Sequence, residues 1–189
     1  MDEKNPKQLR KNVRSSKVGL SEPVRIVSAV DDSRIRSAVE ACVAEVASEV
    51  NATGPRQTVY VLGRYRNDET YMPRNYDATR VEVKFITVHS SKGLECAHVI
   101  LPKMTSETLG FPSRVADDSV MQLAMPSGDS HEYAEERRLF YVALTRARST
   151  VTLITLARKE SPFIGELVKD HKLKIRSVDG FESSSEVCP

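Results

Sequence analysis

The chain has 189 residues, of which 40% are hydrophobic and 29% charged, and its formal net charge is +2. This length and composition exclude an intrinsically disordered chain and are sufficient for one domain with a hydrophobic core. The sequence contains no apolar stretch of the roughly 18 residues that a membrane-spanning helix needs, and no apolar signal segment at its start. Three cysteines in no metal-like spacing predict reduced thiols and no metal site. We therefore expect a cytoplasmic globular protein that does not enter a membrane.

The chain divides into three parts. Residues 1–22 are rich in lysine and arginine and lack apolar periodicity, so we expect a basic extended lead-in. Such an arm is more often solvated than bound to phosphate. Residues 23–180 are expected to form the folded domain, and residues 181–189, with three successive serines, a flexible tail.

Predicted strands and helices alternate through the domain. In chain order, we expect a strand at 24–30, a helix at 31–50, strands at 58–62, 81–88 and 99–101, a helix at 134–148, a strand at 150–156, a helix at 161–170 and a strand at 172–178. A loop-rich stretch, 104–130, precedes the second helix. Apolar strands that alternate with helices predict an α/β fold with a mostly parallel sheet flanked by helices.

One polar segment, T-V-H-S-S-K-G-L-E at 87–95, follows a predicted strand. Ligands of open α/β sheets bind beyond the carboxyl ends of the strands. The hydroxyls and the lysine are donors of the kind that phosphates accept, Gly93 permits a tight turn, and Glu95 could accept hydrogen bonds from a ribose. By itself the segment is equally compatible with a surface loop, because short motifs match by chance.

A second segment, E-E-R-R-L-F-Y-V-A-L-T-R-A-R at 135–148, predicts a largely buried helix. Its glutamates would lie at the positive end of the helix, and Arg146 and Arg148 at the negative end, which is a purely structural role. The alternative is an arginine finger, a guanidinium that binds a γ-phosphate and stabilises charge as the bond breaks. A third arginine, Arg64, follows the strand at 58–62, where a surface position is the simpler interpretation.

In this order, the two segments resemble motifs V and VI of superfamily 1 helicases of the UvrD/Rep type, and the G-F-P at 110–112 and S-P-F at 161–163 resemble the helicase IV branch. The resemblance implies a RecA-like (P-loop NTPase-like) fold. It implies that Arg146 is the catalytic finger on ATP, that Glu95 binds the ribose, and that Gly93 shapes the loop between the nucleotide and DNA sites.

The same resemblance implies a track for single-stranded DNA along Thr87 and His89. Arg64 matches a DNA-side arginine of the family, although its flanking residues differ from the usual pattern. The implied activity is ATP-dependent translocation, in the 3′→5′ direction.

Three departures from the complete motor are visible. The sequence contains no G-x-x-x-x-G-K-[ST] loop, no acidic pair for magnesium after a strand, and no N-Y-R-S-type motif IV. We therefore expect the second RecA-like lobe of a longer helicase, whose N-terminal RecA-like lobe would bind most of the ATP and Mg²⁺. The isolated chain is expected not to hydrolyse ATP.

Three other interpretations remain open. Some relatives of the family remodel protein complexes and act on RNA polymerase instead of unwinding DNA. A degenerate lobe could persist as a DNA- or protein-binding module without catalysis. An ordinary α/β domain with chance matches is the last, and two ordered motifs with correct flanking elements count against it.

Overall fold

A computed structural model describes residues 22–51, 54–114 and 133–178. The predicted tail at 181–189 and the lead-in at 1–22, apart from Glu22, lie outside the described residues, as does the 115–130 part of the predicted loop. Within the described ranges, none of the helices has the length and apolar character that crossing a membrane requires.

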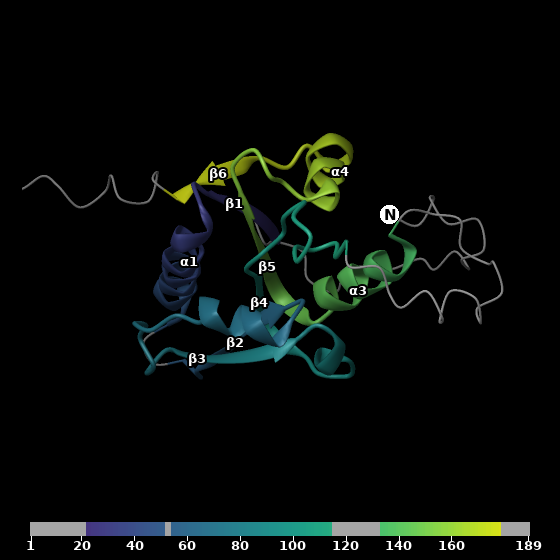
Figure 1. The fold of residues 1–189 in the computed structure, drawn as a ribbon. Helices are drawn as coiled ribbons and strands as arrows, with labels where there is room; N and C mark the ends of the chain where they lie inside the picture. Colours follow the sequence, from purple (N-terminus) through teal and green to yellow (C-terminus); the bar gives the residue numbers. More distant parts are fainter. Residues whose placement is uncertain (1–21, 52–53, 115–132, 179–189) are drawn as a thin grey trace, which may run out of the picture.

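The centre of the domain is a parallel sheet of 6 strands (Figure 1). The strands are β1 (Val24–Ala29), β2 (Gln57–Gly63), β3 (Val81–Thr87), β4 (Cys96–Leu101), β5 (Ala147–Leu156) and β6 (Ile175–Ser177). They lie in the order β3-β2-β4-β5-β1-β6, and every neighbouring pair is parallel. The predicted RecA-like α/β class is confirmed. β4 begins three residues earlier than the predicted 99–101, because Cys96 already pairs with Ala147.

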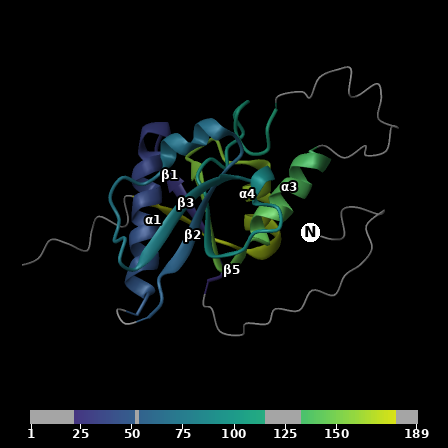
Figure 2. The same cartoon turned by 90° about the horizontal axis from the view of Figure 1, so that it is seen from below.

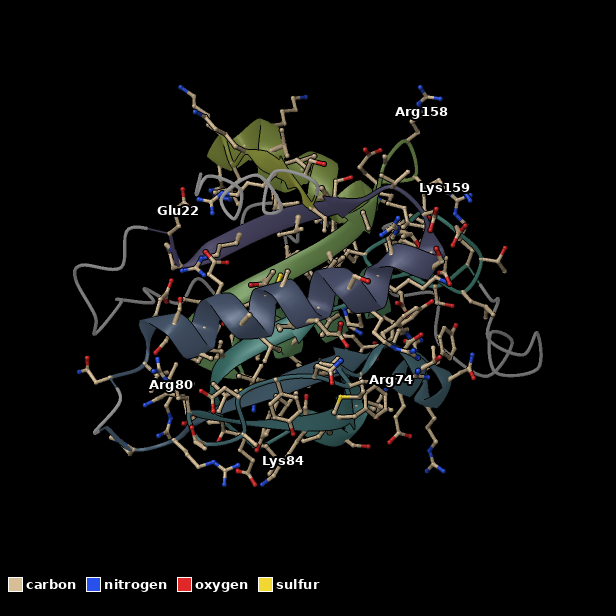
Figure 3. All side chains as sticks on the ribbon, turned by 90° about the vertical axis from the view of Figure 1, so that its left-hand side faces the viewer. Glu22, Arg74, Arg80, Lys84, Arg158 and Lys159 are labelled. Carbon is tan, nitrogen blue, oxygen red and sulfur yellow. The ribbon has the colours of Figure 1, made fainter. Side chains whose placement is uncertain are left out.

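Helix α1 (Ile35–Glu49) covers one face of the sheet (Figures 2 and 3). It follows a short 3₁₀ helix, η2 (Asp32–Arg34), whose cap is Asp31: the carboxylate accepts a hydrogen bond from the backbone of Arg34, as the predicted helix start requires. The apolar stripe of α1 packs on side chains from β1, β2, β3, β4 and β5 to form one hydrophobic core. This periodicity places the helix as the sequence predicted.

Helices α3 (Ala134–Leu144) and α4 (Pro162–His171) lie on the other face (Figure 2). Ser161 caps α4 by accepting from the backbone of Phe163, and Pro162 occupies the first turn, so the helix begins where the sequence predicted it. Phe140 of α3 stacks on Phe163 of α4 with ring centroids 5.1 Å apart. A second core therefore fixes α3 against the sheet, and α3 carries much of the candidate site.

The predicted helix at 134–148 is too long. α3 ends at Leu144, Thr145 and Arg146 form a turn, and residues from Ala147 belong to β5. The local sequence has good helix formers, but the parallel pairing of Ala147 with Cys96 gives this backbone partners across the sheet. Arg146 and Arg148 are therefore not the last turn of a helix.

Two further 3₁₀ helices lie where the sequence predicted only loops. They are η3 (Arg66–Tyr71) and η4 (His89–Ser91), which follow β2 and β3. Asp68 in η3 is buried, and its carboxylate accepts from the backbone N–H of Tyr65 at 2.9 Å. Burial raises the pKa of Asp68 above its usual range, although hydrogen bonds from the backbone oppose the effect.

Candidate functional site

The predicted site residues lie at the two opposite ends of the strands. We call the end where the strands finish the carboxyl edge of the sheet, and the end where they begin the amino edge. Gly63 pairs with Thr87 at the ends of β2 and β3, so Arg64, Thr87 and His89 are at the edge where these strands finish. Cys96 pairs with Ala147 at the starts of β4 and β5, so Glu95 and Arg146 are at the edge where those strands begin. Because all strands are parallel, these are different edges. Only the first group therefore lies beyond the carboxyl ends of the strands, where ligands of open α/β sheets bind; Glu95, which was expected there, does not.

The amino-edge cluster consists of Glu95, Arg146 and Arg148. Arg146 lies in the turn between α3 and β5, and three neutral acceptors hold its guanidinium. Nε donates to the carbonyl of Val142 at 3.0 Å, Nη1 to the carbonyl of Leu94 at 3.0 Å, and Nη2 to the hydroxyl of Thr145 at 3.1 Å. Among the residues that the structure describes, no carboxylate forms an ion pair with it. The guanidinium is thus oriented while its charge stays available to an anion.

Glu95 forms an exposed ion pair across the ends of two strands. Both Nε and Nη2 of Arg148 lie 2.8 Å from one carboxylate oxygen, Oε2. The other oxygen, Oε1, accepts no hydrogen bond from the described residues, so it is available to a donor from outside. The sequence predicted Glu95 as an acceptor, but not Arg148 as its partner.

The backbone of the T-V-H-S-S-K-G-L-E segment connects the two edges. It leaves β3 at Thr87, turns through η4, and reaches Glu95 at the start of β4. Gly93 has φ +84, a left-handed conformation that favours glycine, so the tight turn predicted there is confirmed. Not every hydroxyl of the segment is available to a ligand, because the buried Ser91 donates to the carbonyl of Val88 at 2.7 Å.

The carboxyl-edge cluster consists of Arg64, Ser113 and Glu136. Arg64 donates to both oxygens of Glu136, through Nε at 3.0 and 3.1 Å and through Nη2 at 2.6 Å. The backbone N–H of Ser113 donates to the same carboxylate at 2.9 Å. The two paired side chains are only 17% and 11% exposed. Arg64 is thus part of a half-buried structural contact, and a ligand would have to share its guanidinium with Glu136.

Thr87 and His89 lie beside this cluster in a more open setting. His89 is exposed, and Thr87 donates its hydroxyl proton to Ser90 at 2.9 Å. The backbone of Val88, between them, donates to the carbonyl of Gly63, which immediately precedes Arg64. The three predicted DNA-side residues are therefore brought together at one edge.

Helix α3 connects the two clusters. Glu136 is in its first turn, and Arg146 follows its last residue by two positions. The helix has 11 residues and is about 16 Å long, which is close to the length of a strand of this sheet. It therefore extends from the carboxyl edge to the amino edge. A shift of α3 would move both clusters together.

The side chains at the amino edge are suited to contact a nucleotide rather than a metal ion. Arg146 offers positive charge and Glu95 a free acceptor, which are the complements of a phosphate and a sugar hydroxyl. The described part of the chain contains no group of three His, Cys, Asp or Glu side chains that could hold a metal ion. Cys96, next to Glu95, is a free buried thiol, and burial raises its pKa to about 11, so it is a neutral side chain at pH 7.

Sequence reasoning missed Glu136 and Arg148 as partners. Glu136 is 72 residues from Arg64, and Arg148 is 53 residues from Glu95. No local pattern links such distant positions. The available signal was that Glu136 and Arg148 both lie in the second motif segment and carry charges opposite to those of Arg64 and Glu95, which the sequence had already singled out.

Comparisons with known proteins agree with this architecture. Residues 21–158 match the family model of the UvrD-like helicase C-terminal domain. The chain is 30% identical over 173 residues to DNA helicase IV of Escherichia coli, a match that covers 89% of this chain and 23% of that protein. It is 34% identical over 88 residues to the ATP-dependent DNA helicase Rep of the same organism, covering 47% of this chain and 11% of Rep.

A third relative is the probable DNA helicase II homolog of Mycoplasma capricolum, 35% identical over 99 residues, with 47% of this chain and 12% of that protein covered. The chain thus spans less than a quarter of each of these relatives. The predicted resemblance to UvrD/Rep-type helicases is confirmed, and the chain belongs to the family of UvrD-like helicase C-terminal domains.

Proposed function

We propose that this chain is the second motor lobe of a superfamily 1 DNA helicase, folded over residues 23–180. A preceding RecA-like lobe would complete the ATP site, and the full protein would translocate 3′→5′ on single-stranded DNA. The family model and the helicase relatives support the motor assignment. The direction rests on the resemblance of the two motif segments to UvrD/Rep-type helicases.

The state of Arg146 carries the proposal. A structural arginine is commonly neutralised by a carboxylate, as Arg64 is by Glu136. Arg146 is instead bound by Val142, Leu94 and Thr145, all neutral acceptors. Fixed orientation and uncompensated charge are what an arginine finger needs, because the side chain must meet a γ-phosphate without first breaking an ion pair.

Glu95 and Gly93 complete the proposed nucleotide side. The backbone on both sides of Glu95 is bonded to Arg146: the carbonyl of Leu94 accepts from Nη1, and the N–H of Cys96 donates to the carbonyl of Arg146. The backbone of Glu95 is therefore held beside the finger, which suits one nucleotide contacted at its sugar and its γ-phosphate. Gly93 sets the turn that delivers Glu95 to this position.

The proposed DNA side is the opposite edge. His89 is exposed and Thr87 lies beside it, so both are accessible to a strand of nucleic acid. Arg64 lies at the same edge, where a DNA phosphate would share its guanidinium with Glu136. Contacts of these types to phosphate and sugar position a strand without reading its sequence.

The mechanism couples the two edges. ATP supplies the phosphoanhydride bond, and Mg²⁺ held mainly by the preceding lobe would offset its charge. Arg146 would reach the γ-phosphate only when the lobes close, so closure would determine the rate of hydrolysis. Because α3 joins Glu136 to Arg146, and the segment from Thr87 to Glu95 joins the same edges, closure would shift the DNA-side residues.

The test is the ATPase activity of the full-length protein that contains this lobe, measured with and without single-stranded DNA. Arg146→Ala is expected to lower the DNA-stimulated kcat by about 10³-fold or more, with nucleotide binding largely retained. The matched control is Arg74→Ala, because Arg74 is exposed beside α1 on the opposite face (Figure 3).

The control variant should retain wild-type kcat. Activity that is independent of DNA, or that survives the loss of Arg146, would contradict the motor assignment. The isolated chain is expected to show no turnover, and robust hydrolysis by it would contradict the need for a second lobe.

A further inference from the structure

The ion pair between Glu95 and Arg148 occupies only one of the two carboxylate oxygens of Glu95. Two guanidinium nitrogens converge on Oε2 at 2.8 Å, and Oε1 remains without a partner among the described residues. The pair of Arg137 and Glu166 uses both oxygens, one with each of two guanidinium nitrogens, whereas the exposed pair of Arg138 and Glu135 also uses a single oxygen. At Glu95 one oxygen anchors the side chain and the other is presented to solvent.

Arg148 is well placed to hold that orientation. It is the second residue of β5, and Glu95 immediately precedes β4, the strand paired with β5. Their neighbours Cys96 and Ala147 pair across the two strands, and Arg148 lies at the irregularity that follows this pair, so the sheet anchors the backbone beside the ion pair. The ion pair restrains the two side chains. Without Arg148, the exposed glutamate would sample several rotamers and lose a defined direction for Oε1.

We propose that Arg148 is a positioning residue for sugar recognition: it orients Glu95 so that Oε1 accepts a hydrogen bond from a ribose hydroxyl, and thereby discriminates against a nucleotide that lacks that hydroxyl. The inference rests on the proposed nucleotide site and deepens it. A site that is built to accept a hydroxyl proton discriminates against the analogue that lacks the hydroxyl, because the polar group is then left unpaired. Arg146 acts at the phosphate end, and Arg148 at the sugar end.

The alternative role of Arg148 is a surface ion pair with no function. Its side chain is 67% exposed and that of Glu95 54%, and pairs of this kind contribute little to folding. Both roles predict a small change in stability when Arg148 is removed. They differ in nucleotide selectivity, which a surface ion pair would leave unchanged.

The experiment compares steady-state hydrolysis of ATP, 2′-deoxy-ATP and 3′-deoxy-ATP by the full-length protein with saturating single-stranded DNA. The wild type is expected to show a KM for at least one deoxy analogue about tenfold above that for ATP, the size of one hydrogen bond to a charged group. Arg148→Ala should lower that ratio by about threefold or more, through a higher KM for ATP, while kcat changes little.

Three further variants make the result specific. Glu95→Ala should lose the selectivity to at least the same extent, and Arg148→Lys should restore part of it, because an ammonium can still pair with Oε2. The control is Arg176→Ala, which removes an exposed arginine of β6, the outermost strand of the sheet, where it pairs with Glu22. This control should retain both the wild-type selectivity and a melting temperature close to that of Arg148→Ala.

The outcomes separate this inference from the proposed function. If Glu95→Ala abolishes selectivity and Arg148→Ala does not, Glu95 reads the sugar without help and the positioning role is wrong. A fall in kcat with unchanged selectivity would place Arg148 at the phosphates and also overturn it. If the wild type does not discriminate, or Glu95→Ala leaves selectivity intact, both the sugar contact of Glu95 and the role of Arg148 are wrong, while the test on Arg146 still decides the motor assignment.

Discussion

The two edge clusters use arginine in contrasting ways. At the carboxyl edge, Arg64 is half-buried and bound by both oxygens of Glu136, so its charge is cancelled where it lies. At the amino edge, Arg146 also donates three hydrogen bonds, but to carbonyls and a hydroxyl that leave its charge uncancelled. At these two positions the partners of the guanidinium distinguish a charge that is compensated within the fold from one that is kept for a ligand.

The comparison first predicts a large difference in stability between two neighbouring glutamates. Glu136→Ala leaves Arg64 without its carboxylate and the backbone N–H of Ser113 without its acceptor, so we expect a loss of about 3 kcal/mol in the free energy of unfolding. Glu135→Ala is the control, because Glu135 is in the same turn but 63% exposed, in an i,i+3 pair with Arg138. That control should lose less than about 1 kcal/mol, since such pairs contribute little.

Urea unfolding of the chain measures both variants. Equal losses for Glu135→Ala and Glu136→Ala would contradict the structural role of the carboxyl-edge cluster. A loss at Glu136 that disappears when Arg64 is also changed to methionine would support it, because the cost comes from stranding the arginine.

Much of this fold was predictable because its signals are local. The caps at Asp31 and Ser161, the apolar stripe of α1 and the apolar strands gave the element types and their order. The end of α3 was not predictable in this way. Thr145 and Arg146 have acceptable helix propensity, and the chain leaves the helix because Cys96, distant in sequence, pairs with Ala147.

The sequence suggested candidate site residues, but not their arrangement or their partners Glu136 and Arg148. Motif resemblance identified Arg146, Glu95 and Gly93, and the turn at Gly93 is confirmed. Arg64 and Arg146 lie at opposite edges because all strands are parallel, and Arg64 follows β2 whereas Arg146 precedes β5. The strand order decides which residues become neighbours at each edge, and alternation of strands and helices does not determine it. The roles of these residues stay predictions until the variants above are measured.

A second, smaller effect tests how well the carboxyl edge is sealed from water. Asp68, only 6% exposed, lies near Arg64, and burial raises the pKa of its carboxyl group. The folded state therefore holds this proton more tightly than the unfolded state does. Its contribution to stability is fully present below the unfolded pKa and is lost as the pH rises through the higher folded pKa.

Asp68→Asn removes this titration and keeps a side-chain oxygen that can accept from Tyr65. We therefore expect the free energy of unfolding of the wild type, minus that of the variant, to fall as the pH rises from about 3 to about 7. Urea unfolding at a series of pH values measures this difference. A difference that grows with pH would show that the hydrogen bonds to the carboxylate outweigh its burial.

The smallest effect concerns the backbone between the two edges, and a pair of glycines isolates it. Neither Gly93 nor Gly165 has an atom within 4 Å of the position that a Cβ would occupy, so neither variant creates a clash. Gly93 has φ +84, whereas Gly165 lies within α4. Gly93→Ala is expected to cost about 1 kcal/mol in the free energy of unfolding, from the strain of a left-handed alanine. Gly165→Ala is expected to gain about 0.5–1 kcal/mol, from the reduced freedom of the unfolded chain.

The opposite signs make this pair a sharp test, because a general effect of added methyl groups would move both variants in the same direction. Gly93 also lies where the backbone passes from Thr87 and His89, the proposed DNA-side residues, to Glu95, so its strain has a second consequence. If the turn relaxes to relieve the strain, Glu95 moves relative to Arg146, and the KM for ATP of the full-length protein should rise more in Gly93→Ala than in Gly165→Ala. A Gly93→Ala variant that loses stability but retains the wild-type KM would show that the amino-edge cluster is held by β4, β5 and α3 alone, without the turn that joins it to the carboxyl edge.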